Sequence, residues 1–173
     1  RNPMQILIAT DGHLDPEVAA DLAARLAEKG DTVTVATVIE VPRTLLTELR
    51  AFYRTPPPKA AIDEDHEYVG QPTAGTLSKQ WPGDDAMIAR FVADKKTKRT
   101  NPLKQALEAR GLTPVVIAKE SDAPAATIVG LVAEYDIELL IIGTHGRSRL
   151  EGLLGSTGTK LARLAPCSLI LVR

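Results

Sequence analysis

Short, continuously apolar runs that alternate with helical patterns are the feature that most restricts the fold of this chain. Strands without polar alternation are buried on both faces, and in α/β proteins such strands form a parallel sheet. The sequence therefore predicts an α/β fold with helices on both faces of the sheet. The expected strands are Gln5–Ala9, Thr32–Ile39, Pro114–Ala118, Leu139–Ile142 and Ser168–Val172.

Capping signals predict the helices between these strands. Asp15-Pro16-Glu17 has the pattern of an N-cap, a first helical residue and a favourable first-turn acid, and Gly30 is the expected stop. Further helices are expected at Leu45–Tyr53, after a cap at Asp84 or Asp85, after a cap at Ser121 or Asp122, and at Ser156–Leu164.

Pro102 leaves two interpretations of the middle of the chain open. Either Asn101-Pro102 begins a second helix that runs to Arg110, or one helix is kinked at Pro102, where proline costs roughly 3 kcal/mol. Gly111 ends the helix in both cases. The basic run Lys95–Arg99 is interpreted as a solvated helix end.

The length of 173 residues fits one well-buried domain, which we expect over residues 4–173. Residues 43–83, which include Pro56-Pro57-Pro58 and the acidic patch Asp63-Glu64-Asp65, are expected to form an irregular insertion. Neither flank of this insertion is a complete domain, so it is interpreted as an excursion from one domain. Its role is left open between a lid and a docking arm for a partner.

Composition and charge exclude several classes of protein. The net charge of −1 argues against a nucleic-acid binder that relies on bulk electrostatics, and no apolar run approaches the length of a membrane span. The single cysteine, Cys167, excludes an internal disulfide, and it is expected to be an inert buried thiol in a cytoplasmic protein. The histidines lack companions at metal-ligand spacing, so no metal site is expected.

Glycines after the fourth expected strand indicate a phosphate-binding loop. Gly143 and Gly146 follow Leu139–Ile142, and Gly155-Ser156-Thr157 precedes a helix. Glycines allow the backbone to approach an anion, and the start of a helix offers unpaired N–H groups. Backbone amides and hydroxyls of Ser156 and Thr157 would meet phosphate oxygens, and Arg147 or Arg149 would add charge. The alternative is a turn that merely joins strand to helix.

Asp11 follows the first expected strand and has two interpretations. It would meet Gly143 at the carboxyl edge of the sheet if the first and fourth strands are neighbours, and ligands bind at such edges. The alternative is an Asp-Gly turn in which the carboxylate bonds its own backbone. His145, between the loop glycines, is interpreted as a tolerated loop residue rather than an acid–base group.

Two end motifs carry a resemblance to the universal stress protein family. Gly143-Thr144-His145-Gly146 followed by Gly155-Ser156-Thr157 is similar to the family's glycine motif, and Ile6–Gly12 is similar to its first strand and aspartate. The resemblance covers about residues 4–42 and 103–173. The eight residues Arg147 through Leu154 separate Gly146 from Gly155, where the family pattern has nine.

The resemblance implies a flavodoxin-like (adenine nucleotide alpha hydrolase-like) five-stranded parallel sheet of order 3-2-1-4-5, with ATP or AMP in its crevice. Mg²⁺ would accompany ATP. Asp11 would face ribose or adenine with Thr10 beside it, and Val38 would touch adenine through its backbone. Ribose and phosphates would be held by Gly143, Gly146, Gly155, Ser156 and Thr157.

The function expected is that of a nucleotide-binding regulatory protein of the stress response. A scaffold that has lost nucleotide binding and a slow ATPase are the alternatives, and no catalytic residue is assigned. Ser168–Val172 is an apolar edge strand that can pair with a second copy about a twofold axis, and the resemblance also implies dimerisation through this strand. A homodimer is therefore expected.

Overall fold

The computed structural model describes residues 2–54, 81–144 and 155–173. The chain divides into two compact units, one made of Arg1–Val41 with Val92–Arg173 and the other of Pro42–Phe91. The first unit holds every strand of the sheet. The single domain expected over residues 4–173 stays a prediction.

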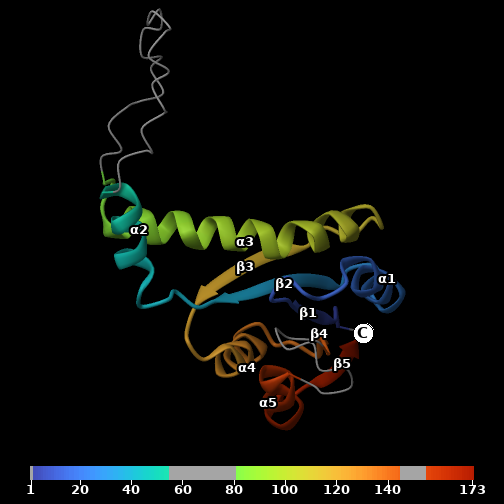
Figure 1. The fold of residues 1–173 in the computed structure, drawn as a ribbon. Helices are drawn as coiled ribbons and strands as arrows, with labels where there is room; N and C mark the ends of the chain where they lie inside the picture. Colours follow the sequence, from blue (N-terminus) through green and yellow to red (C-terminus); the bar gives the residue numbers. More distant parts are fainter. Residues whose placement is uncertain (1, 55–80, 145–154) are drawn as a thin grey trace, which may run out of the picture. The chain divides into compact units, whose positions relative to one another are not determined.

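A five-stranded parallel sheet forms the centre of the first unit (Figure 1). Its strand order is β3-β2-β1-β4-β5, with every neighbouring pair parallel. The fold class and the order 3-2-1-4-5 are thereby confirmed. The strands are β1 (Gln5–Ala9), β2 (Thr32–Ile39), β3 (Val115–Glu120), β4 (Leu139–Gly143) and β5 (Ser168–Val172).

Helices cover both faces of this sheet (Figure 1). Helix α1 (Pro16–Leu26) and the later part of α3 (Asp84–Glu108) pack on one face, where Ala19, Leu103 and Leu107 join Ile6 and Ile8 in one buried cluster. Helices α4 (Pro124–Glu134) and α5 (Ser156–Leu164) pack on the other face. The buried members of both clusters are Ile, Leu, Val and Ala, as a chain with 3% aromatic residues requires.

The predicted start of α1 is confirmed, and that of α4 is corrected. Oδ1 of Asp15 accepts the N–H groups of Glu17 and Val18, and α1 ends at Leu26, before Gly30 is reached. The N-cap of α4 is Ala123, because Pro124, which has a fixed φ and no N–H, takes the first helical position. The expected cap residue Ser121 instead accepts the N–H of Ala123 within the preceding turn.

Residues 84–108 form one helix that contains Pro102, so the two-helix interpretation is wrong. The proline removes one hydrogen bond of the helix. The basic run Lys95–Arg99 lies inside this helix rather than at its end, and Arg99 is half-buried. The interpretation of the run as a solvated helix end is therefore also wrong.

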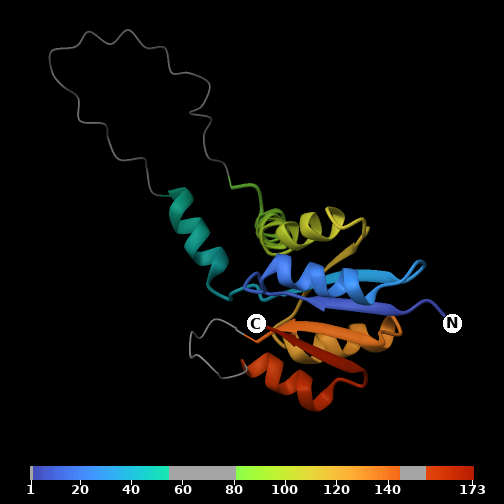
Figure 2. The same cartoon turned by 90° about the vertical axis from the view of Figure 1, so that its right-hand side faces the viewer.

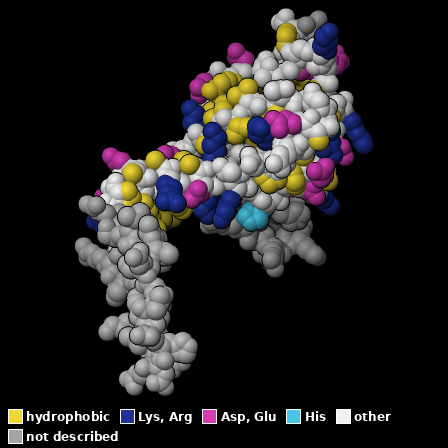
Figure 3. Space-filling view, turned by 90° about the horizontal axis from the view of Figure 1, so that it is seen from above, with side chains coloured by type: hydrophobic (Ala, Val, Ile, Leu, Met, Phe, Trp, Pro, Cys, Tyr) yellow, Lys and Arg dark blue, Asp and Glu magenta, His cyan; other side chains and the backbone are white. Residues whose placement is uncertain are grey.

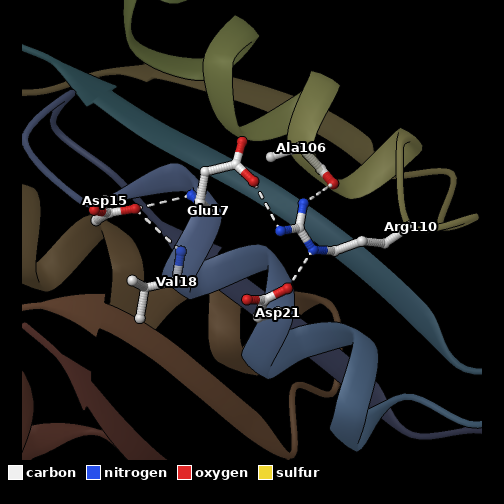
Figure 4. A network of polar contacts seen from close by, with 6 residues as sticks. All are labelled: Asp15, Glu17, Val18, Asp21, Ala106 and Arg110. Carbon is white, nitrogen blue, oxygen red and sulfur yellow. Dashed lines mark hydrogen bonds and ion pairs between the residues drawn. The ribbon is translucent and has the colours of Figure 1, made fainter.

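Arg110, in the turn after α3, ties that helix to α1 (Figure 4). Its Nε donates to Asp21 Oδ1 at 2.6 Å, and its Nη2 donates to Glu17 Oε2 at 2.7 Å. A third donor, Nη1, bonds the carbonyl of Ala106 at 2.8 Å. Hydrogen bonds to Asp21 and then to Glu17 raise the pKa of Arg110, so its charge persists at every ordinary pH.

The second unit contains α2 (Leu45–Arg54) and the beginning of α3. Arg50 Nη2 donates to both carboxylate oxygens of Asp84, at 2.6 and 2.5 Å, and its guanidinium lies 5.6 Å from the centre of the Trp81 ring. Trp81 Nε1 donates to the same carboxylate at 3.0 Å. The bond from Arg50 is the main reason why the pKa of Asp84 is lowered. Residues 55–80 of the expected insertion lie outside the described residues.

The described surface carries charges of both signs. Figure 3 shows Lys and Arg side chains interspersed with Asp and Glu on the face that it draws. No helix among the described residues has the length and apolar character that crossing a membrane requires.

Candidate functional site

The candidate site begins where β1 and β4 end side by side. Ala9 is paired with Ile142, so the next residues on the two strands are Thr10 and Gly143. The strand order reverses between β1 and β4, because β2 and β3 lie to one side of β1 while β4 and β5 lie to the other. Ligands of open parallel sheets bind at the carboxyl edge beside such a reversal. The expected meeting of the segments after β1 and β4 is therefore confirmed.

A tight turn after β1 is built from Thr10, Asp11 and Gly12. The N–H of Thr10 still bonds the carbonyl of Ala36 on β2, at 2.9 Å, and its buried hydroxyl accepts the N–H of Gly12 at 3.0 Å. Gly12 has φ +95°, a conformation that side-chain-bearing residues rarely adopt. The chain thus leaves the sheet abruptly at the edge where the candidate site lies.

Asp11 lies at the surface of this turn, and 47% of its side chain is exposed. Its Oδ1 accepts the N–H of His13 at 3.0 Å and lies 3.3 Å from His13 Nδ1. The local bond to its own backbone is the arrangement anticipated for an ordinary Asp-Gly turn. The carboxylate therefore shapes the turn, and its exposed half faces solvent at the carboxyl edge.

Gly143 and the start of α5 form the second side of the site. Gly143 packs against the loop after β1, since a Cβ built on it would lie 3.4 Å from Leu14 Cδ1, an ordinary contact distance. Gly155 is the N-cap of α5 and has no side chain with which to cap the amides of Ser156 and Thr157. Helix α5 begins at the edge where β4 ends (Figure 2). Gly146, Arg147 and His145 lie outside the described residues.

Val38 presents its backbone to the same edge. Even-numbered residues of β2 face β1, since the carbonyl of Ala36 bonds Thr10, whereas the carbonyl of Ile39 bonds Ser121 beside β3. Strand β1 ends at Ala9, opposite Ala36, so no β1 residue stands opposite Val38. The N–H and C=O of Val38 consequently point into the space beyond the end of β1.

Arg99 is a residue of this edge that the sequence analysis missed. Its Nη1 donates to the carbonyl of Val38 at 2.8 Å, and its Cγ lies 3.2 Å from the position that a Cβ of Gly12 would occupy. A signal was present: Arg99 precedes Leu103 and Leu107 at intervals of four residues, which places it on their buried helix face. The run of neighbouring charges concealed that spacing.

Cys167 precedes β5 at the opposite end of the sheet and is half-buried. Burial raises the pKa of its thiol above the ordinary value. A raised pKa lowers the thiolate fraction, so this feature favours the inert thiol over a redox role. Within the ranges that the structure describes, no three His, Cys, Asp or Glu side chains form a group that could hold a metal ion.

Comparisons with known proteins give a family match over nearly the whole chain and a curated relative over half of it. The family model described as the universal stress protein family matches residues 3–173. A universal stress protein from Methanothermobacter thermautotrophicus is 34% identical over 95 residues, which cover 50% of this chain and 63% of that protein. The matched part therefore spans less than two thirds of this relative.

Solved structures share the fold at low sequence identity. Universal stress protein UspA from Lactobacillus plantarum is 17% identical with a TM-score of 0.59, and the match covers 100% of this chain and 99% of that chain. A universal stress protein solved in complex with cAMP is 18% identical with a TM-score of 0.52, covering 100% of this chain and 98% of that chain.

Proposed function

Because this chain belongs to the universal stress protein family, we propose that it binds an adenine nucleotide, ATP or AMP, at the carboxyl edge of its sheet. Binding there would make it a cytoplasmic regulatory protein of the stress response, with partners that read the nucleotide-bound state. The proposal requires no chemical step at the nucleotide, and hydrolysis of ATP is at most slow.

The observation that carries this proposal is the juxtaposition of the ends of β1 and β4 with the start of α5. Thr10 and Gly143 are the next residues after the paired Ala9 and Ile142. The amides of Ser156 and Thr157 open α5, where the positive end of the helix dipole favours an anion. The complex of a similar universal stress protein with cAMP supports an adenine nucleotide as the ligand.

Each predicted site residue has a role in this proposal. Asp11 contacts the ribose or adenine with Thr10 beside it, and the backbone of Val38 faces the base. Ribose and phosphates lie against Gly143, Gly146, Gly155, Ser156 and Thr157, while Arg147 adds positive charge and Mg²⁺ accompanies ATP.

A second copy of the chain is the proposed partner of β5, which lies at one edge of the sheet. Leu171 of this strand is 44% exposed. An exposed apolar edge strand can pair antiparallel with its own copy and thereby close the assembly as a homodimer.

Isothermal titration with ATP, AMP and cAMP tests nucleotide binding, and Ser156→Glu gives a sharp control. Residue 156 is the first residue of α5, where a carboxylate stabilises the helix by about 0.3–1 kcal/mol but repels a phosphate. We expect the wild type to bind at least one of these nucleotides. The variant should bind it about tenfold more weakly, with an unchanged or higher melting temperature.

The alternative function is a scaffold of the same fold that has lost nucleotide binding. The eight residues between Gly146 and Gly155, one fewer than in the family pattern, favour it. Absence of heat with all three nucleotides, from protein shown to be folded by circular dichroism, would reject the nucleotide proposal and leave the scaffold.

A further inference from the structure

The backbone of Val38 is exposed to the candidate site because β2 outlasts β1. The last pair of the two strands is Ala9 with Ala36, while β2 continues to Ile39. The carbonyl of Val38 therefore has no strand partner on the β1 side. A bare carbonyl in that place would be an acceptor for a hydrogen-bond donor on a ligand.

Arg99 changes the chemistry of this position. Its guanidinium donates to the Val38 carbonyl at 2.8 Å, and its aliphatic stem lies along Gly12. A guanidinium carries five N–H donors, has no acceptor and keeps its charge at any ordinary pH. At the carboxyl end of β2, the guanidinium of Arg99 thus lies in front of the carbonyl of Val38.

We propose that Arg99 is a specificity-determining residue of the base subsite, which it shifts from 6-amino toward 6-oxo purine nucleotides. The inference rests on the proposed function, which places a purine beside Val38. The 6-amino group of adenine is a donor and must share the carbonyl with the positively charged Arg99, which repels the positive end of the amine's N–H dipole. The 6-oxo group of hypoxanthine is an acceptor and can bond the guanidinium without displacing it, as arginine bonds O6 of guanine in nucleic acids.

Because Arg99 is half-buried, an adenine amine that displaced it from Val38 would lose binding free energy. Arg99 is half-buried, and hydrogen bonds that involve a charged group are stronger than neutral ones. An adenine amine that replaced Arg99 at Val38 would exchange a charge-assisted bond for a neutral one. The 6-oxo base retains the charge-assisted bond and adds a second.

The test compares the affinities of AMP and IMP, which differ at position 6 of the base, for the full chain and two variants. Arg99→Met removes the donors but keeps an unbranched stem against Gly12, so the packing of α3 is retained. Arg110→Met is the matched control, because Arg110 also extends from the α3 segment but bonds α1 instead. Circular dichroism verifies that each variant is folded.

We expect the wild type and Arg110→Met to bind both AMP and IMP, with the same ratio of dissociation constants in the two proteins. In Arg99→Met the ratio of the two dissociation constants should shift about tenfold in favour of AMP, as the loss of one charge-assisted bond predicts. The same ratio in the wild type and in Arg99→Met, with measurable binding in both, would overturn the role of Arg99 and leave nucleotide binding intact. Binding of neither nucleotide to any folded protein would instead reject the proposed function, and this inference with it.

Discussion

Arg99, in α3, and Arg110, in the turn that follows α3, bond different parts of the first unit. Arg110 bonds two carboxylates on α1, whose side chains are 68% and 55% exposed for Glu17 and Asp21. Arg99 donates to the neutral carbonyl of Val38, where β2 continues past the end of β1. The two contacts differ in kind: Arg110 joins two helices through surface carboxylates, whereas Arg99 places a donor at the carbonyl of Val38, where ligand binding is proposed.

The side chain of Arg99 packs against Gly12. The substitution Gly12→Ala should therefore have the largest effect on stability. Its φ of +95° strains any side-chain-bearing residue, and the new Cβ would lie 3.2 Å from Arg99 Cγ. We expect a loss of about 1–3 kcal/mol in the free energy of unfolding, measured by urea denaturation. The AMP to IMP ratio should shift in the same direction as in Arg99→Met, because the stem of Arg99 is displaced.

Gly143→Ala is the control for this prediction. Its Cβ would make an ordinary contact of 3.4 Å with Leu14 Cδ1, and Gly143 is not among the glycines with positive φ. The expected loss is below about 1 kcal/mol. Equal losses in the two variants would contradict the role given to Gly12.

Arg110→Met should have a smaller effect, confined to stability. Both carboxylates of these ion pairs are exposed, and pairs with exposed partners contribute little and are screened by salt. We expect a slightly lower melting temperature than that of the wild type, with a difference that shrinks between about 0.05 M and about 0.5 M salt. A shift of the AMP to IMP ratio in this variant would break the comparison between the two arginines.

The smallest effect should be that of pH on the stability difference between the wild type and Arg110→Met. The pKa of Arg110 is raised by Asp21 and Glu17, so its contribution is fully present below the unfolded pKa and is lost only as pH rises through the folded value. Between about pH 6 and about pH 10 the stability difference between the wild type and Arg110→Met should therefore be constant. Urea denaturation at several pH values measures it, and a steady decline over this range would contradict the assignment.

Local chemistry made the start of α1 and the whole of α5 predictable from the sequence. Asp15 and Pro16 set the first turn of α1 without help from distant residues, and the expected bounds of α5 and β5 match the structure. The third strand was less predictable. It runs from Val115 to Glu120, since Lys119 and Glu120 pair with the end of β2, and such pairing of polar residues leaves no apolar signal.

The glycines of the candidate site and the turn at Asp11 could be predicted from the sequence, whereas the presence of Arg99 could not. Asp11 lies two residues beyond the apolar strand β1 and Gly143 ends the apolar strand β4, so a parallel sheet brings their backbone to one edge. The contact between Arg99 and Val38 joins residues far apart in the sequence and depends on how α3 crosses β2. The helical spacing could assign Arg99 to the buried face of α3. Its partner, the carbonyl of Val38, could not be assigned without the register of β1 against β2, which leaves Val38 beyond the end of β1.

Strand β2 continues past the end of β1 inside the sheet, away from its two outer strands. The N–H and C=O groups at the end of β2 belong to the backbone, so they persist when side chains of β2 change, except on substitution by proline. Under the proposal, a single substitution at Arg99 in α3 would change recognition of the base without changing any side chain of the sheet. Under the proposed function, selectivity for the base would then be set by a helix that lies outside the sheet.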